Sequence, residues 1–412
     1  MRDSNFKLQR RPSGALFKNY LKYLGIFFVF YIIVAPTLNI MIDPKGYFFL
    51  FNQKSLNSFK PFSNGNRVQK SLLLKNGNFD ALIAGTSRAE MGIDPKHPKL
   101  NKYKTFNVGL IASNIFETHK VLQFAQKHQD IKLLIWGIDL FSFNANVDTQ
   151  QDYNLSLFAD EDNIYRIYLG YLLSFKTLKT SFKTFKLNFS RNTVMSYIRA
   201  DGFRATSAKH KVPVRHIFRR TIRSDFIDND STYSGFSYDD LRLFLMRETL
   251  DRYSKKETQI VLFISPVHAW QLELIDQLGL FDHYERMKRD LVKMVVLFNA
   301  EHKSATQIKL WDFGTYHPVS TEKIPPEDDS ETQLNWFWES SHYKKELGDR
   351  ILSLILEEPA KTRTTPEFGV LLSPENIDRE IAELERQKLK YQMENPGEVQ
   401  EITRLIDVAL KR

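Results

Sequence analysis

The chain has 412 residues, of which 42% are hydrophobic and 26% charged, proportions that indicate a folded protein rather than a disordered one. It contains no cysteine, which excludes a disulfide framework, a thiolate metal site and a cysteine nucleophile. The net charge is +9, but residues 1–23 alone carry six Lys or Arg against one Asp, and no nucleic-acid-binding motif follows. We therefore expect one main domain with insertions and no nucleic-acid partner.

Residues 24–42 form an uncharged, mostly apolar run of nineteen residues, about the length that a helix needs to cross a bilayer. The basic tail, residues 1–23, predicts by the positive-inside rule that the N-terminus is cytoplasmic and that residues 43–412 lie outside. A cleaved signal peptide, which would have a shorter apolar region, and a buried core helix are the alternatives. We expect a single-pass, uncleaved anchor in the inner membrane and an exported, periplasmic domain.

Residues 43–78 combine aromatic residues with Gly, Pro, Asn and Ser, which is typical of an irregular connector, here close to the membrane. Over residues 79–357, short apolar runs alternate with amphipathic stretches, a pattern that predicts strands and helices around a parallel sheet. The predicted strands are residues 79–84, 105–108, 132–138, 259–265 and 307–313. The predicted helices are residues 115–125, 238–253, 272–300 and 343–356. This order favours an α/β fold with a flavodoxin-like, doubly wound parallel sheet.

Residues 144–236 form an insertion between the third and fourth predicted strands that is too long for an ordinary crossover and must have structure of its own, mostly helical. Lysines and five apolar side chains recur in it at helical spacing, which indicates a basic amphipathic helix. The apolar side chains are Phe175, Leu178, Phe182, Phe185 and Phe189. Residues 176–223 hold thirteen Lys or Arg and one acidic residue, a bias that favours anionic headgroups or an acidic glycan. The alternative is a stripe of core-facing phenylalanines with a solvated lysine face.

Residues 358–412 are expected to form a helical appendage without chemistry. The sequence Ser-Pro-Glu at residues 373–375 is a typical helix start, and the apolar residues Ile377, Ile381 and Leu384 follow at helical spacing. Pro396 interrupts this helix, and a second one is expected over residues 399–410.

The first predicted strand runs into Gly85-Thr86-Ser87-Arg88, which places a serine at the carboxyl end of a strand, the edge where open α/β sheets bind ligands. The N-terminus of the following helix favours negative charge there, so Ser87 is a candidate nucleophile. Small residues also serve as helix caps at such turns, which is the alternative.

Glu339 and His342 lie three residues apart just before the last predicted helix of the domain. A serine nucleophile needs a base, and the base needs a group that fixes its tautomer and stabilises the imidazolium. His342 and Glu339 have the chemistry for these two roles, the alternative being a capped helix start or a surface pair. No second histidine or carboxylate cluster stands at metal-ligand spacing, so we expect no metal site.

Together these residues resemble the SGNH/GDSL hydrolase superfamily over residues 79–357, excluding the insertion. Its members have a serine after the first strand, a glycine after the second, an asparagine after the third and Asp-x-x-His before the last helix. The resemblance implies that Ser87 is the nucleophile, His342 the base and Glu339 the acid, that the amide of Gly109 helps to form the oxyanion hole, and that no cofactor is needed. The chain is also similar to the exported, membrane-anchored branch that serves O-acetylation of bacterial polysaccharides or D-alanylation of teichoic acids.

The chain departs from this pattern in two motifs. Asp139 stands where the family's asparagine donates an amide hydrogen to the oxyanion, and an ionised Asp139 would repel that charge. We therefore expect low or lost activity, or another donor such as Asn107 or Asn114. The first motif has Arg88 after the serine, and an inward-pointing Arg88 would bring a compensating positive charge.

His268 follows the fourth predicted strand and is therefore expected at the same edge as Ser87, where we predict that it binds substrate. The alternative is a histidine that caps a loop or satisfies a buried carbonyl. Trp311, Trp336 and Trp338 near this edge are candidates to stack on sugar rings, or else are core anchors.

The function that we expect is serine-dependent acyl transfer to a cell-envelope polysaccharide outside the inner membrane. A cell-envelope glycan substrate and a membrane-bound acyl donor protein are the expected partners. The alternatives are an esterase or deacetylase that uses the same triad, and a non-catalytic glycan-binding or assembly subunit.

Overall fold

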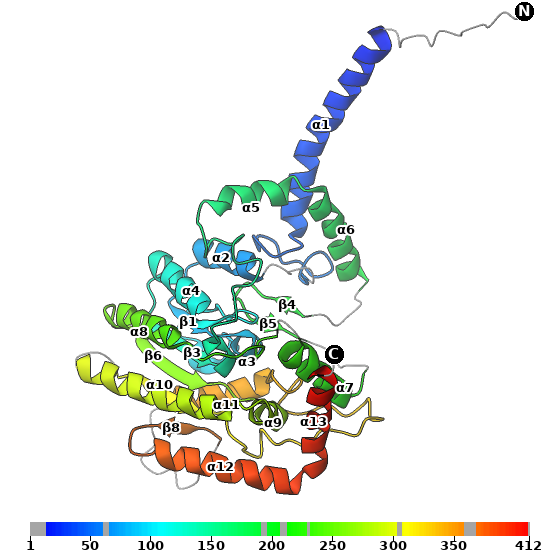
Figure 1. Ribbon diagram of the computed structural model, residues 1–412. Coiled ribbons are helices and arrows are strands. Elements are labelled where there is room, and N and C mark those ends of the chain that lie inside the picture. The colour runs from blue at the N-terminus through cyan, green and yellow to red at the C-terminus, as the bar shows by residue number, and fades with distance from the viewer. Residues whose placement is uncertain are drawn as a thin grey trace, which may run out of the picture.

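The computed structural model describes residues 14–60, 66–190, 196–206, 212–228, 231–302, 307–357 and 368–410 (Figure 1). Its centre is a six-stranded sheet with the order β2-β1-β3-β6-β7-β8. The strands are β1 (Ala81–Ala84), β2 (Thr105–Asn107), β3 (Leu133–Ile138), β6 (Gln259–Ile264), β7 (Lys309–Asp312) and β8 (Val370–Leu372). The first five pair in parallel, and β8 joins β7 antiparallel. The five predicted strands are thus confirmed, and the parallel ones follow the 2-1-3-4-5 order of doubly wound sheets.

Helices cover both faces of the sheet, because its central strands are apolar throughout and must be shielded from water on each side. All residues of β1 and β3 are buried. On one side α4 (Ile115–His128), α8 (Asp240–Ser254) and α10 (Phe281–Glu301) pack in a row, and α3 (Ser87–Gly92) packs against α11 (Lys345–Ile355). Right-handed crossovers in this strand order put these two groups on opposite faces.

The helix expected over residues 272–300 is two helices, α9 (Ala269–Gln277) and α10. Gly279 separates them with a φ of 72°, a left-handed backbone conformation that glycine adopts without strain. The apolar periodicity continues across the break, which is why the sequence pattern suggested one helix.

The expected connector, residues 43–78, contains a helix that the sequence did not indicate, α2 (Asn66–Asn76). Its Lys70 is buried and pairs with Glu90 of α3 at 3.0 Å, and its Arg67 pairs with Glu117 of α4. The segment is therefore packed into the domain rather than being only an irregular link.

The C-terminal segment is also part of the domain. Strand β8 extends the sheet, α12 (Ile377–Glu394) packs on α10, and α13 (Pro396–Leu410) packs on α9 (Figure 1). Both expected helices are confirmed, but the segment is not a purely helical appendage.

The insertion is closed at its base by an antiparallel bridge between Asn144 and Tyr238, close to the expected boundaries. Its elements are α5 (Asn163–Leu172), α6 (Phe175–Phe189), the hairpin β4 (Tyr197–Ile198) with β5 (Arg204–Ala205), α7 (Val214–Thr221) and a π-helical turn, η3 (Ile222–Ile227). Short 3-10 turns, η1 (Pro98–Leu100) and η2 (Leu140–Phe143), follow α3 and β3. The amphipathic helix is confirmed as α6, but the alternative of core-facing phenylalanines is wrong, because all four phenylalanines are exposed.

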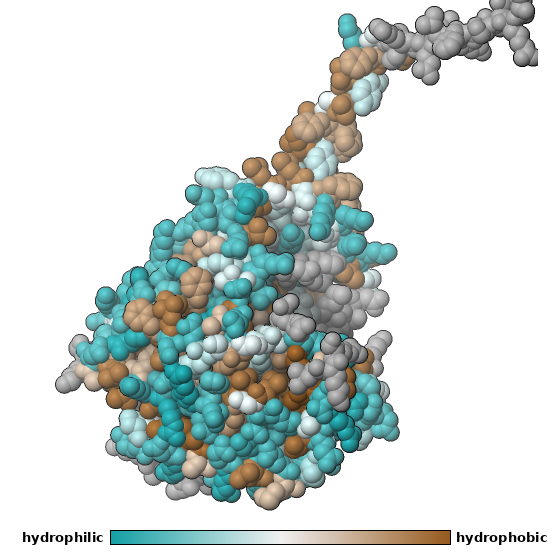
Figure 2. All heavy atoms as spheres, in the orientation of Figure 1, coloured by the Kyte–Doolittle hydropathy of each residue, from teal (hydrophilic) through white to brown (hydrophobic). Residues whose placement is uncertain are grey.

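The N-terminal helix α1 (Gly14–Ile42) has 29 residues, is long and apolar enough to span a membrane, and projects from the domain (Figure 1). Figure 2 shows apolar side chains over much of its projecting surface. The first four basic residues of the predicted tail, Arg2 to Arg11, lie outside the described residues. Helices α5 and α6 flank the end of α1 that joins the domain.

Candidate active site

Ser87 lies at the carboxyl edge of the sheet, as the first residue of α3 directly after the turn from β1. Gly85 has a φ of 138°, and a Cβ there would lie 2.7 Å from the carbonyl oxygen of Gly137, so only glycine fits. Thr86 caps α3, because its Oγ1 accepts a hydrogen bond from the amide of Arg88 at 3.2 Å. The sequence therefore fixes a tight turn that presents Ser87 between β1 and β3, where the strand order reverses.

The structure brings Ser87, His342 and Glu339 into one hydrogen-bonded chain. His342 Nε2 lies 2.7 Å from Ser87 Oγ, although the two residues are 255 positions apart in sequence. His342 Nδ1 contacts Glu339 Oε1. In the tautomer with hydrogen on Nδ1, this N–H donates to the carboxylate, and Nε2 is free to accept the hydroxyl hydrogen of Ser87. This is the geometry of a serine nucleophile with its base and orienting acid.

Glu339 is fixed by backbone amides as well as by the imidazole. The amides of His342 and Ser341 donate to Oε1 and Oε2, each at 2.8 Å. Burial alone would raise the pKa of Glu339, but His342 and these amides outweigh it and lower the pKa below its usual value. The carboxylate is therefore ionised at neutral pH and able to stabilise an imidazolium.

Arg88 points inward and pairs with Asp139, with 2.6 Å between Nη1 and Oδ1 and side-chain exposures of 3% and 1%. Asp139 also accepts a hydrogen bond from Thr86 Oγ1 at 2.6 Å. Arg88 Nε donates to Ser341 Oγ at 3.1 Å. The Arg88–Asp139 pair therefore joins α3 to the loop that holds Glu339. The inward-pointing Arg88 that the sequence left open is therefore found, and it compensates the charge of Asp139.

The expected oxyanion donor Gly109 has another partner in this structure. Its amide donates to Asn107 Oδ1 at 2.9 Å, and Asn107 Nδ2 donates to the carbonyl oxygens of Ala89 and Ile93, each at 2.9 Å. The side chain of Asn107 thus braces α3 from inside the domain. Neither group faces an incoming substrate in this arrangement, contrary to the sequence-based expectation.

Asn114, the other alternative donor, caps α4. Its Oδ1 accepts from the amide of Glu117 at 2.9 Å, and its Nδ2 donates to the carbonyl oxygen of Val147 at 2.6 Å. The amide of Ser87 itself lies at the first position of α3, where a helix provides no backbone acceptor. Of the donors considered, Ser87 N–H is therefore the one best placed for an oxyanion.

His268 does not contribute to this site, so the prediction that it binds substrate is wrong. It caps α9, with Nδ1 accepting from the amide of Trp270 at 3.2 Å, and Nε2 lies 2.7 Å from the carbonyl oxygen of Glu322. Burial lowers the pKa of His268 to about 4. The second interpretation, a cap that satisfies a buried carbonyl, is the one found.

A cleft of about 450 Å³ opens over Ser87 and His342. Arg204 and Gln150 of the insertion line it together with apolar side chains such as Phe141. Arg204 is held by Glu90 of α3, with 2.9 Å between Nε and Oε2. Sequence reasoning missed these insertion residues, because no linear spacing connects them to the serine motif.

The tryptophans lie apart from this cleft. Trp338 lines a neighbouring cleft of about 620 Å³, and both clefts include Met91. Trp311 stacks on Phe313, and Trp336 lies under the guanidinium of Arg350. Only Trp338 is therefore placed to meet a ligand that extends from the Ser87 cleft.

Over the described part of the chain, no group of three or more His, Asp or Glu side chains is arranged to hold a metal ion. No protein-family model and no curated protein matches the chain.

Proposed function

We propose that this chain is a serine-dependent acyl-transfer enzyme of the SGNH/GDSL type, anchored in the inner membrane by α1, with its domain on the periplasmic side. The proposed substrate is a cell-envelope polysaccharide, acylated from a membrane-bound donor. The observation that supports the proposal is the hydrogen-bonded chain Ser87–His342–Glu339 at the carboxyl edge of a parallel sheet.

In the proposed reaction, Ser87 Oγ attacks the carbonyl carbon of the donor ester while His342 Nε2 takes the hydroxyl proton. Glu339 stabilises the imidazolium, and the tetrahedral oxyanion is received by the amide of Ser87. Collapse expels the donor alcohol, which takes the proton from His342 and leaves an acyl-serine. A sugar hydroxyl then gives its proton to His342 and attacks the acyl carbon. The bond to Ser87 Oγ breaks, and His342 returns the proton to Oγ, which regenerates the free serine.

Two features support transfer rather than hydrolysis: the membrane anchor, and an oxyanion site with a single well-placed donor among those considered, the amide of Ser87. A tether beside a membrane-delivered donor raises the effective concentration of that donor, which benefits a transferase more than a hydrolase. Because Asn107 occupies the amide of Gly109, turnover against water is expected to be slow, whereas a positioned acceptor still lowers the barrier. The same occupied amide is the observation that favours a non-catalytic glycan-binding subunit as second candidate.

The reaction is tested by giving the purified full chain a generic acetyl ester, with and without envelope oligosaccharide, and measuring free acetate and acetylated sugar. Ser87→Ala is the negative control, and Ser231→Ala, a serine that lines the same cleft, is the matched control. We expect acetylated sugar that requires Ser87 but not Ser231. Rapid acetate release that oligosaccharide does not divert would identify an esterase, and no turnover would support the binding subunit.

The orientation is tested by reporter fusions to the C-terminus. We expect an active alkaline phosphatase fusion, since this enzyme matures only outside the cytoplasm, and a silent cytoplasmic reporter. The reverse pattern would contradict both the topology and a function in the cell envelope.

A further inference from the structure

Helix α6 has three different faces. The buried face is polar and consists of Thr177, Ser181, Thr184 and Asn188. A second face is apolar and exposed, with exposed fractions of 71% for Phe175, 61% for Phe182, 41% for Phe185 and 70% for Phe189. A third face has four exposed lysines: Lys176, Lys179, Lys183 and Lys186. A helix that buries its hydroxyl side chains and exposes its phenylalanines is inverted relative to a helix on the surface of a water-soluble domain.

The polar face is buried because it fixes α6 to the end of α1. Ser181 Oγ lies 2.9 Å from Oδ1 of Asn39 in α1, and Asn39 Nδ2 donates to the carbonyl oxygen of Leu172 at 3.0 Å. Farther along α6, Asn188 Nδ2 donates to the carbonyl oxygen of Phe59 at 2.7 Å. These hydrogen bonds hold the phenylalanine face in a fixed direction beside α1.

The turn between α5 and α6 lies against the side of α1. Tyr31 Oη donates to the carbonyl oxygen of Leu173 at 2.9 Å. At 1.5 Å per residue, the backbone of Tyr31 lies about 16 Å along the helix from Ile42. The backbone of Asn39, whose side chain bonds the neighbouring carbonyl of Leu172, lies about 5 Å from Ile42, so the turn lies between these two levels. Residues 24–42 extend only about 28 Å, close to the ~30 Å of a hydrocarbon core. If α1 crosses a bilayer with this segment, the turn and its exposed apolar side chains lie below the headgroups.

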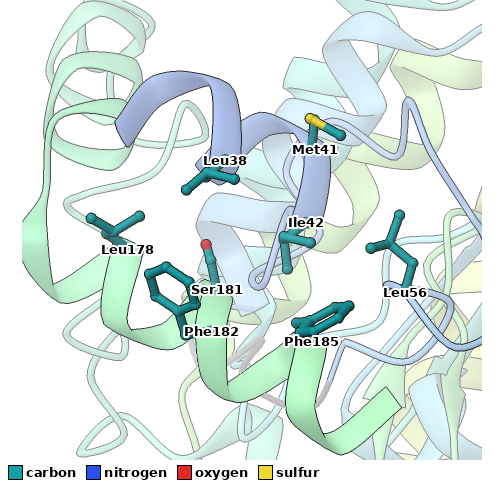
Figure 3. Close-up of a pocket in the computed structure, with 8 residues that line it drawn as sticks. All are labelled: Leu38, Met41, Ile42, Leu56, Leu178, Ser181, Phe182 and Phe185. Carbon is teal, nitrogen blue, oxygen red and sulfur yellow. The ribbon is translucent and has the colours of Figure 1, made fainter. Parts of the chain in front are cut away.

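An apolar groove of about 250 Å³ separates α6 from α1 (Figure 3). Phe182 and Phe185 of α6 line one side, and Leu38 and Met41 of α1 line the other. The groove joins the phenylalanine face to the apolar surface of α1, so the two form one continuous surface.

The lysine face completes an interfacial pattern. Within the described ranges, none of the four α6 lysines has an ion-pair partner. Lysines beside an apolar face suit the phosphate level of an anionic bilayer, where their stems lie along the acyl boundary and their charges meet headgroups.

We propose that α5 and α6 form a membrane-docking surface for an anionic phospholipid bilayer, on the side of the membrane that holds the domain. The phenylalanine face enters the acyl region, the groove beside α1 takes an acyl chain, and the lysines contact headgroup phosphates. This surface and α1 together attach the domain at two places and fix its orientation to the bilayer. The inference requires that α1 spans the membrane, and it is independent of the acyl-transfer chemistry.

The absence of cysteine from the sequence allows a direct test. Single cysteines replace Phe182 in α6, Phe244 in α8 and Ile26 in α1, and each carries an environment-sensitive fluorophore. Phe244 is the matched control, since it is 62% exposed against 61% for Phe182, and its helix, α8, lies away from α1 in Figure 1. The full chain is reconstituted into phosphatidylcholine vesicles with phosphatidylglycerol, and quenching by nitroxide-labelled lipids is measured.

We expect blue-shifted emission and lipid-dependent quenching at positions 182 and 26, and neither at position 244. Equal, water-like emission at 182 and 244 would overturn the proposal. A label at 182 that is shielded but not quenched would also overturn it, because a second copy of the chain would then cover the face. An unquenched label at position 26 would overturn the premise that α1 spans the membrane.

The lysine contribution is tested with Lys179→Glu/Lys183→Glu, against Lys255→Glu/Lys256→Glu at the end of α8 as a charge-matched control. A lysine close to an anionic surface contributes about five-fold to binding. We expect the first pair to lower the docked fraction at position 182 only when phosphatidylglycerol is present. Equal effects of both pairs would show that net charge, rather than the α6 lysines, determines docking and would contradict the proposed headgroup contacts.

Discussion

Asp139→Asn separates the structural role of the Arg88–Asp139 pair from the role that the sequence pattern suggests. The two side chains are buried and 2.6 Å apart. Removing one charge leaves Arg88 buried without its counterion, and breaking such a pair costs about 3–5 kcal/mol of folding free energy. Because Arg88 also holds Ser341 beside Glu339, we expect Asp139→Asn to lower the reactivity of Ser87 as well. The sequence pattern predicts the opposite, since asparagine would restore the expected oxyanion donor.

The assay is urea denaturation of the full chain in mild detergent, together with the rate at which Ser87 reacts with a fluorophosphonate. Asp148→Asn, at an exposed aspartate, is the control and should change stability by less than about 0.5 kcal/mol. In a double-mutant cycle, Arg88→Met should recover part of the loss caused by Asp139→Asn. Unchanged stability with faster labelling of Ser87 in Asp139→Asn would refute the assignment of a structural ion pair.

Three further changes test the supports of the site. His268 has a folded pKa of about 4, below its ordinary 6.5, so its stabilising effect is full above pH 6.5 and is lost as pH falls towards 4. The lost free energy of unfolding approaches ~3 kcal/mol. In His268→Asn, the urea midpoint should no longer fall for this reason between pH 6.5 and 4. Gly85→Ala should lower the free energy of unfolding by about 1–3 kcal/mol and slow the labelling of Ser87, because residue 85 has a φ of 138° and the new Cβ meets Gly137. A variant as stable as the wild type would contradict the turn geometry. Asn107→Ala should lower the free energy of unfolding by about 1–3 kcal/mol, because it removes buried hydrogen bonds, and it also frees the amide of Gly109. An unchanged urea midpoint would argue against a stabilising role of Asn107 behind α3.

The parallel sheet could be predicted because its central strands, β1 and β3, are short, wholly apolar runs. The order of the serine and histidine motifs then brought both to one edge. Strand β8 could not, since it has three residues and pairs only after the chain returns to β7. Helix α2 was missed because Arg67 and Lys70 are buried by ion pairs with distant carboxylates, which no local pattern indicates.

The details of the site required three-dimensional information. The sequence placed Ser87, Glu339 and His342 together, but it could not show that Asn107 would occupy the amide of Gly109. It also assigned His268 to the site, because a residue after a strand lies near the edge without necessarily facing the cleft. The direction of each side chain depends on neighbours that are remote in sequence.

The central claim is that Ser87 is an activated nucleophile, and fluorophosphonate labelling followed by peptide mass spectrometry of the full chain tests it most directly. The geometry predicts one modified residue, Ser87, with labelling abolished in Ser87→Ala, strongly reduced in His342→Ala and unchanged in Ser231→Ala. Absence of labelling at Ser87 in folded protein, or labelling at Ser87 that is indifferent to His342, would contradict it.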